Sequence, residues 1–224
     1  MTKALLFDFN GTLIFDAHIV DKGWKILLEP LIHRSITQKE LDEVAHGTNA
    51  SSCLEYFLGK ENVTEELIDE IDVIYRKNAK EEFKKGNYHL APGAEQFLNV
   101  LKEKQIPMTI ATSSPILNID LYFELFHLDR WFDRDRLMYN DGSFPGKPSP
   151  YIYLEAAKKL ECDIHECIVM EDAIAGIQSG KNADAKKVIA ITEFNNDETL
   201  LEAGADVVIH DYLDIENLLK ELEI

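Results

Sequence analysis

Short apolar runs alternate with segments of helical periodicity, and this alternation limits the folds that the chain can adopt. Runs typical of buried strands cover residues 4–9, 108–111, 167–170, 187–191 and, more weakly, 206–209. Between the first two runs, one helix face is formed by Ala94, Phe97, Leu98 and Leu101. Strands that alternate with helices predict an α/β fold with a doubly wound parallel sheet, covered by helices on both faces.

Prolines mark two of the predicted helix starts. Ser114 and Pro115 form an N-cap followed by proline at the first helical position, and this helix is expected to run to about residue 126. Pro150 likewise begins a helix that is expected to end near residue 160.

Residues 16–87 differ from the rest of the chain, because they show helical periodicity and no convincing strand. The clearest helix starts at Thr64 and ends at Gly86, with acidic residues near its start and lysines near its end, as the helix dipole favours. Its apolar stripe contains Leu67, Ile68, Ile71, Ile74, Tyr75 and Phe83. We therefore expect a helical domain inserted after the first strand, at residues 16–87, between the two parts of a core formed by residues 1–15 and 88–224.

The composition is that of a globular protein with an acidic surface. Of the 224 residues, 46% are hydrophobic, and 23 basic against 41 acidic residues give a net charge of −18. Such a surface repels nucleic acids and anionic membranes, so we expect neither as a partner. An anionic small-molecule substrate would need a local cluster of positive charge.

The sequence shows no sign of export or membrane insertion. No apolar run approaches the ~20 residues that a membrane helix needs, and no signal-peptide pattern precedes the first strand. We expect a cytoplasmic protein and, at this size, a monomer. Cys53, Cys162 and Cys167 have no metal-type spacing, so reduced thiols are expected.

Polar residues capable of chemistry follow several of the predicted strands. Ligands of open parallel sheets bind outside the carboxyl ends of the strands, so these residues should converge on one edge. They are Asp8 to Thr12 after the first run, Thr112 to Ser114 after the second, Lys147 in a Gly/Pro loop, and Glu171 with Asp172 after the third.

This set fits phosphoryl transfer. A carboxylate such as Asp8 can attack phosphorus and form an aspartyl-phosphate, which divides one difficult step into two. Glu171 and Asp172 can supply oxygen ligands for Mg²⁺, which would hold the negative nucleophile and phosphate together. Lys147 and Thr112 can bind the remaining phosphoryl oxygens.

Each of these features also has an ordinary structural explanation. Asp8 before Asn-Gly can be a turn, Thr112 to Ser114 can cap a helix, Lys147 can be solvated, and Glu171 with Asp172 can be an acidic helix start. Four such features in this order favour the catalytic interpretation.

The sequence resembles the haloacid dehalogenase (HAD) superfamily, in particular its β-phosphoglucomutase-like and sugar-phosphate phosphatase branch. The resemblance covers nearly the whole chain. It is carried by Asp8-Phe9-Asn10-Gly11-Thr12-Leu13, Ile110-Ala111-Thr112-Ser113-Ser114, Gly146-Lys147-Pro148-Ser149-Pro150 and Val169-Met170-Glu171-Asp172-Ala173-Ile174-Ala175-Gly176-Ile177.

The resemblance implies a Rossmann-like core and a mobile helical cap that closes over a phosphorylated metabolite. It implies Asp8 as the nucleophile, and a phosphate site formed by Thr112 and Lys147 with Gly11, Ser113 and Ser114 beside them. It also implies Mg²⁺ bound by Asp8, the Asn10 backbone carbonyl and Asp172, with Glu171 in or next to that shell.

Position 10 departs from the family pattern. Active phosphatases of the superfamily usually have an aspartate there, which protonates the leaving oxygen and then deprotonates water, and the amide of Asn10 can do neither. Four explanations stay open: a substrate with a good leaving group such as an acyl phosphate, a proton supplied by His18 or His46, a slow or purely binding protein, or an engineered substitution. If proton transfer alone is missing, an Asn10→Asp variant should gain activity.

Related chemistries fit less well. Dehalogenases of the superfamily usually need no metal, and the phosphonate-cleaving members use a cap lysine that the predicted cap loop, residues 46–52, does not contain. That loop is neutral, whereas the mutase carries a basic residue there for a second phosphate.

We therefore predict a Mg²⁺-dependent phosphatase that acts on a small phosphorylated metabolite, with sugar phosphates favoured. The alternatives are a catalytically impaired member that binds a phosphometabolite or partner protein, a phosphomutase and, more distantly, a non-enzymatic scaffold.

Overall fold

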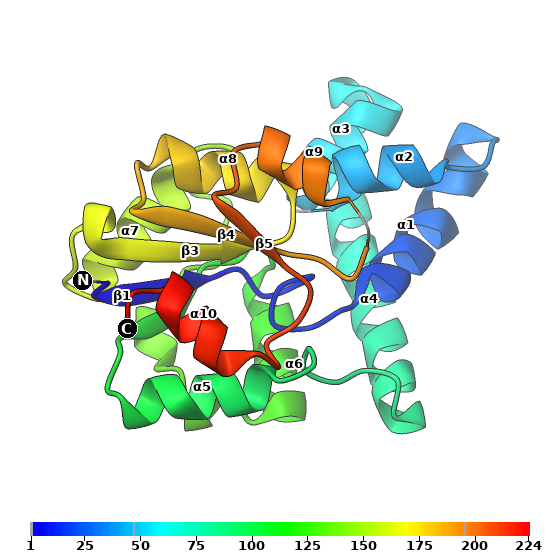
Figure 1. Ribbon diagram of the computed structural model, residues 1–224. Coiled ribbons are helices and arrows are strands. Elements are labelled where there is room, and N and C mark those ends of the chain that lie inside the picture. The colour runs from blue at the N-terminus through cyan, green and yellow to red at the C-terminus, as the bar shows by residue number, and fades with distance from the viewer. Residues whose placement is uncertain (1, 47, 195) are drawn as a thin grey trace.

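A parallel β-sheet forms the centre of the protein (Figure 1). The structure is a computed structural model that describes residues 2–46, 48–194 and 196–224. Within these residues the sheet has five strands in the order β2-β1-β3-β4-β5, and every neighbouring pair is parallel. The strands are β1 (Ala4–Phe7), β2 (Met108–Ile110), β3 (Cys167–Glu171), β4 (Lys187–Ile191) and β5 (Val207–Ile209). The predicted α/β fold with a parallel sheet is confirmed.

Helices cover both faces of this sheet because successive strand residues point to opposite sides. Leu5 and Phe7 of β1 belong to one apolar cluster, and Ala4 and Leu6 belong to another. The first cluster is closed by α5 (Ala94–Glu103), α6 (Ile116–Phe126) and α10 (Ile215–Glu221). The second is closed by α7 (Tyr151–Lys159), α8 (Ile174–Asn182) and α9 (Asp197–Glu202). The predicted doubly wound arrangement is therefore present.

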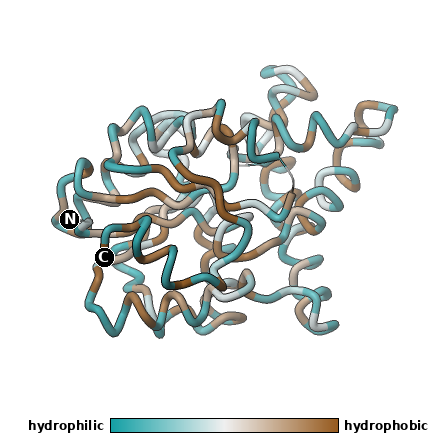
Figure 2. Tube along the Cα trace, viewed as in Figure 1, coloured by the Kyte–Doolittle hydropathy of each residue, from teal (hydrophilic) through white to brown (hydrophobic). Residues whose placement is uncertain are grey.

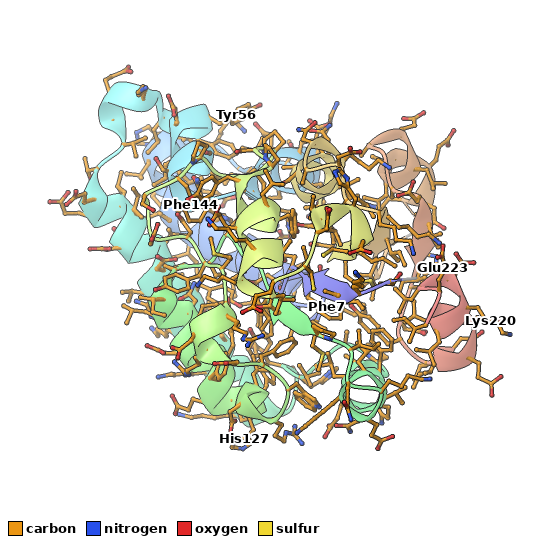
Figure 3. All side chains as sticks on the ribbon, turned by 90° about the vertical axis from the view of Figure 1, so that its left-hand side faces the viewer. Phe7, Tyr56, His127, Phe144, Lys220 and Glu223 are labelled. Carbon is orange, nitrogen blue, oxygen red and sulfur yellow. The ribbon has the colours of Figure 1, made fainter. Side chains whose placement is uncertain are left out.

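The apolar strands are surrounded by more polar helices and loops, as Figure 2 shows. In Figure 3, Phe7 lies in the middle of the molecule, whereas Lys220 and Glu223 lie at the periphery near α10. Within the described residues, no helix has both the length and the apolar character needed to cross a membrane. Cys53, Cys162 and Cys167 are unpaired, as expected.

A group of helices stands beside the carboxyl ends of the strands (Figure 1). It contains α1 (Ala17–Ile32), α2 (Gln38–Glu40), α3 (Ala50–Leu58) and α4 (Glu65–Lys85). These helices have an apolar core of their own, which includes Trp24, Leu28, Leu54 and Ile71. Residues of α4 also join the main core through Tyr75 and Ala79. The division of the chain into a core and a cap at residues 16–87 stays a prediction.

Short helical turns complete the structure. One is the π-helical turn η1 (Leu41–Ala45). The others are 3₁₀ turns: η2 (Lys60–Asn62), η3 (Leu128–Arg130), η4 (Arg134–Arg136) and η5 (Ile164–Glu166).

The ends of α4 agree with the sequence. Thr64 Oγ1 accepts a hydrogen bond from Leu67 N at 3.3 Å, and Gly86 ends the helix in a left-handed conformation with φ of 77°. The start of α6 differs by one residue from the prediction, because the helix begins at Ile116 and Ser114 does not cap it. The Ser114 hydroxyl instead donates to Asn10 Oδ1 at 2.9 Å.

The two connections between β1 and the rest of the core run side by side. Ile14 and Leu90 form an antiparallel bridge, and Ala91 N donates to Leu13 O at 2.8 Å. The chain then turns at Gly93, which has φ of 80° and precedes α5. A Cβ at Gly93 would lie 2.6 Å from the carbonyl carbon of Tyr212, so glycine is required there on two counts.

We predict that Gly93→Ala lowers the free energy of unfolding by at least about 3 kcal/mol, because it adds a backbone clash to left-handed strain. Gly86→Ala is the matched control, since its φ is 77° and a Cβ there would meet no atom within 4 Å. The control should cost about 1 kcal/mol from backbone strain alone. Denaturant unfolding of both variants measures the difference, and equal losses would contradict the packing argument.

Candidate active site

The sequence-predicted residues meet where the strand order reverses. The chain continues from β1 to β2 on one side of it, and then to β3 on its other side, so the strand order reverses at β1. Asp8 directly follows β1, and Glu171 is the last residue of β3. Open α/β sheets bind ligands in the crevice at such a reversal.

Lys147 joins two of the carboxylates. Its Nζ atom lies 2.5 Å from Asp8 Oδ1 and 2.5 Å from Glu171 Oε1, and all three side chains are buried. Burial disfavours the charged amine, yet the carboxylates of Asp8 and Glu171 hold the pKa of Lys147 above its ordinary value. Lys147, which lies in the Gly/Pro loop expected from the sequence, is therefore a buried cation next to Asp8.

The carboxylate of Glu171 is held at both oxygens. Oε1 accepts from Lys147 Nζ and, at 2.7 Å, from the Tyr153 hydroxyl. Oε2 accepts from the backbone N–H groups of Asp172 and Ala173 at 3.0 and 3.2 Å. A Cβ at Gly176 would lie 1.8 Å from Oε1, so this glycine provides the space for the carboxylate. Glu171 is thus placed to orient Lys147.

Asp172 lies against the loop that follows β1. Its Oδ1 accepts from Thr12 Oγ1 at 3.4 Å. A Cβ at Gly11 would lie 1.9 Å from Asp172 Oδ2, and Gly11 has φ of 75°. Gly11 therefore makes room for Asp172, in addition to the phosphate contact predicted for it.

The site fits a divalent cation. Oxygen atoms of Asp8, Glu171 and Asp172 lie within 4.8 Å of one another. Carboxylate oxygens are the ligands that Mg²⁺ prefers. The residues present therefore suit the ion that the resemblance implies.

Burial and mutual repulsion both act on the protonation of this cluster. Burial raises the pKa of Asp8 to about 7, with the Lys147 ammonium opposing this and Glu171 adding to it. Burial, followed by repulsion from Glu171 and Asp8, raises the pKa of Asp172. A bound cation would offset both repulsions.

A cavity of about 800 Å³ opens above these carboxylates. Its walls include Asp8, Asp172 and the predicted phosphate-binding residues Gly11, Thr112, Ser113 and Ser114. Thr112 Oγ1 accepts from Ser114 N at 3.1 Å, which fixes that turn. The walls also include residues of α1, α4 and the predicted cap loop. Among the described lining residues there is no lysine or arginine.

The predicted cap loop reaches the catalytic side of this cavity. His46, Thr48, Asn49, Ala50 and Ser51 line it, while Gly47 lies outside the described residues. A Cβ at Gly146, next to Lys147, would lie 2.6 Å from Asn49 Nδ2. The loop that carries Lys147 therefore contacts the cap loop directly.

The side chain of Asn10 is held by hydrogen bonds. Its Nδ2 lies 2.6 Å from Asp16 Oδ2, and it lies 2.9 and 3.0 Å from the hydroxyls of Tyr75 and Tyr122. Its Oδ1 accepts from Ser114 Oγ. Of the two histidines considered as proton sources, His46 lines the cavity and pairs with Asp21 at 2.8 Å, whereas His18 is exposed and does not line it.

The structure brings all the predicted site residues to one place, and their catalytic roles stay predictions. Sequence reasoning missed Asp16, Tyr75, Tyr122, Tyr153 and Gly176. Gly176 lies in the motif that contains Glu171, five residues after it, so its role in making space for that carboxylate could have been considered from the sequence. The tyrosines come from distant helices and gave no signal, while Asp16 was assigned only to the start of the helical insert at residues 16–87.

Comparison with known proteins agrees with this site. The family model for haloacid dehalogenase-like hydrolases matches residues 2–184. A phosphorylated carbohydrates phosphatase of Thermotoga maritima is 28% identical over 98% of this chain and 99% of its own. A bifunctional riboflavin kinase/FMN phosphatase of Arabidopsis thaliana is 37% identical over 55% of this chain, a match that spans 32% of that protein's length.

A solved structure supports the same assignment. A HAD hydrolase of family IA, variant 3, from Entamoeba histolytica superposes with a TM-score of 0.83 at 35% identity, over 99% of this chain and 100% of that one. This agreement covers the sheet and helices α1 to α4 alike. The chain therefore belongs to the haloacid dehalogenase-like hydrolase family, and it is a hydrolase with the fold that its motifs predicted.

Proposed function

We propose that this protein is a phosphatase that removes phosphate from a small phosphorylated metabolite through an aspartyl-phosphate on Asp8. One observation carries the proposal: the Asp8 carboxylate lines the cavity while it is hydrogen-bonded to the buried ammonium of Lys147. The Thermotoga relative, named as a phosphatase of phosphorylated carbohydrates, favours a sugar phosphate.

The reaction has two displacements at phosphorus. A carboxylate oxygen of Asp8 forms a bond to phosphorus as the bond to the leaving oxygen breaks, and the leaving alkoxide takes a proton from water. Water then attacks the aspartyl-phosphate, which releases inorganic phosphate and a proton and restores the carboxylate. Lys147 donates to the phosphoryl oxygens, with Glu171 holding its ammonium in place.

Mg²⁺, which enzymes of this family generally use, would be held by Asp8, Asp172 and the backbone carbonyl of Asn10, and it would offset the negative charge of carboxylates and phosphate. Thr112 and the turn up to Ser114 line the cavity where a phosphoryl group would meet Asp8.

The leaving group decides the rate. Asn10 carries no proton that it can release at neutral pH, and general acid catalysis typically contributes ~10²–10⁴-fold. We therefore expect acyl and aryl phosphates to react much faster than alkyl phosphates. The same amide keeps a second candidate function open, a catalytically impaired member that binds a phosphometabolite without rapid turnover.

The cavity favours a substrate with one phosphate. Its described lining contains no lysine or arginine for a second phosphate, and α4 contributes Asp69 and Asp72 to the wall. Carboxylates accept hydrogen bonds from hydroxyl groups and repel anions. A polyhydroxylated, uncharged remainder fits this wall, and a bisphosphate or a phosphomutase reaction does not. We further propose that residues 16–87 act as the cap and that the protein works as a monomer.

The first test is turnover. With p-nitrophenyl phosphate, acetyl phosphate and a panel of sugar phosphates, we expect Mg²⁺-dependent release of phosphate, with acetyl phosphate the faster of the first two. Asp8→Asn should lower kcat by at least ~10³-fold, because it removes the nucleophile. Asp129→Asn, an exposed aspartate outside the cavity, is the matched control and should match the parent. Equal rates in parent and Asp8→Asn would exclude the proposed mechanism.

The second test concerns the metal without requiring turnover. We expect MgCl2 to raise the Tm of the parent, since an ion that binds the folded state at 100 times its Kd stabilises it by about 2.7 kcal/mol. Asp172→Asn should raise the Tm of the metal-free protein, because it removes one of three clustered carboxylates, and should abolish the Mg²⁺ shift. The same Mg²⁺ shift in both proteins would place the ion elsewhere.

The third test is pH dependence at Asp72, whose pKa is raised to about 6 by burial, with Arg76 and Asn118 opposing and Asp69 adding to the effect. The folded state then binds the proton more tightly than the unfolded state, so stability is lost as pH rises from about 4 through 6. Asp72→Asn should exceed the parent in stability by about 1 kcal/mol at pH 7.5, after allowance for solvent screening, and by nothing near pH 4. Unfolding curves at both pH values measure this, and a constant difference would contradict the assignment.

A further inference from the structure

A buried polar cluster lies where the loop after β1 meets α4 and α6. We name it the hinge cluster, and it consists of Asn10, Asp16, Tyr75, Tyr88, Ser114 and Tyr122. Its aspartate and its three tyrosines are each at most 7% exposed. Asp16 directly precedes α1, Tyr75 lies on α4, and Tyr88 lies in the segment that returns to the core. The hinge cluster therefore touches both connections between the helical insert and the sheet.

Asp16 is the acceptor at the centre of this cluster. Its Oδ2 accepts from Asn10 Nδ2 at 2.6 Å and from the Tyr75 hydroxyl at 2.6 Å, and its Oδ1 accepts from Gly11 N at 3.2 Å. A carboxylate that is 1% exposed requires such donors, because an unsatisfied buried charge is strongly destabilising. Asp16 thereby links the loop that carries the Asn10 carbonyl to helix α4.

The side-chain amide of Asn10 suits this environment because it both donates and accepts hydrogen bonds here. Its N–H group donates to Asp16, while its Oδ1 accepts from the hydroxyls of Ser114 and Tyr122 at 2.9 and 3.1 Å. An aspartate at position 10 would keep the acceptor but would place a second carboxylate oxygen 2.6 Å from Asp16 Oδ2, with no hydrogen between them when both groups are ionised. Such a contact is repulsive, and it is strongest where water is excluded.

We propose that Asp16 is a positioning residue for the catalytic loop, and that the amide at position 10 is its required partner. The positioning role rests on the proposed phosphatase function, whereas the pairing itself does not. Asp16 fixes Gly11, which borders Asp172, and through Tyr75 it ties this loop to α4. The acidic group usual at position 10 in this family is thus present six residues later, as a partner of the amide.

The test is a double-mutant cycle with Asn10→Asp, Asp16→Asn and the swapped double variant. Asn10→Asp should lower both Tm and kcat, the latter by ~10-fold or more, even though it supplies the family's usual acid. Asp16→Asn should also lower Tm and kcat, because an amide has one acceptor oxygen and cannot accept from all the donors that the two carboxylate oxygens of Asp16 now bind. The swap reverses donor and acceptor, so it should restore Tm towards the parent and kcat to at least the parent value.

Asn99→Asp is the matched control. The Oδ1 atom of Asn99 accepts from Trp131 Nε1 at 2.7 Å, outside the cavity, so kcat should not change in this variant.

The outcomes are separable. Additive Tm shifts, or an Asn10→Asp variant that is as stable as the parent, would overturn the pairing whatever the activity. Coupled Tm values with kcat unchanged in both single variants would overturn the positioning role. If the parent turns over no phosphate ester, the proposed function fails, and the Tm cycle still tests the pairing. Calorimetric binding of inorganic phosphate in MgCl2 then replaces kcat, with binding weakened in each single variant and restored in the swap as the supporting result.

Discussion

The placement of three carboxylates around one buried ammonium constrains the rest of this structure. Lys147 Nζ contacts both Asp8 and Glu171, and Asp172 completes an acidic group whose oxygens lie within 4.8 Å of one another. Like charges this close are unfavourable in a buried site unless hydrogen bonds, a counter-charge or a cation offset them. The neighbouring sequence is arranged around that requirement: Gly11 leaves space for Asp172, Gly176 leaves space for Glu171, and the Tyr153 hydroxyl donates to Glu171.

Much of this arrangement follows from local sequence. The run at residues 187–191 became β4 (Lys187–Ile191) without change, because a strand buried on both faces is apolar throughout and has sharp limits. The motif residues were predicted to converge because parallel strands end at one edge, and Asp8 and Glu171 lie on adjacent strands β1 and β3. Lys147 was expected at the same edge, but its direct contact with Asp8, 139 residues earlier, was not predicted.

Interactions between distant elements were not predictable in the same way. Ser114 has the sequence of a helix cap, yet its hydroxyl donates to Asn10, and α6 starts one residue later than expected. When a side chain has two possible partners, tertiary structure determines which one it binds, and a local sequence pattern does not contain that information. The tyrosines of the hinge cluster illustrate the same limit: Tyr75 was assigned correctly to an apolar helix stripe, while its hydroxyl binds a carboxylate 59 residues earlier.

The interpretation of Asn10 changes when these distant contacts are included. On the sequence alone it is the absence of an acid, and that absence predicts slow cleavage of poor leaving groups. In the structure its amide donates to Asp16 and accepts from Ser114, so an aspartate there would lose a hydrogen bond and gain a repulsion. A substitution towards the family pattern therefore alters two properties at once, proton transfer and the geometry of the loop. Because these act in opposite directions on rate, the single variant alone cannot measure either, and the residue at position 16 has to be changed with it.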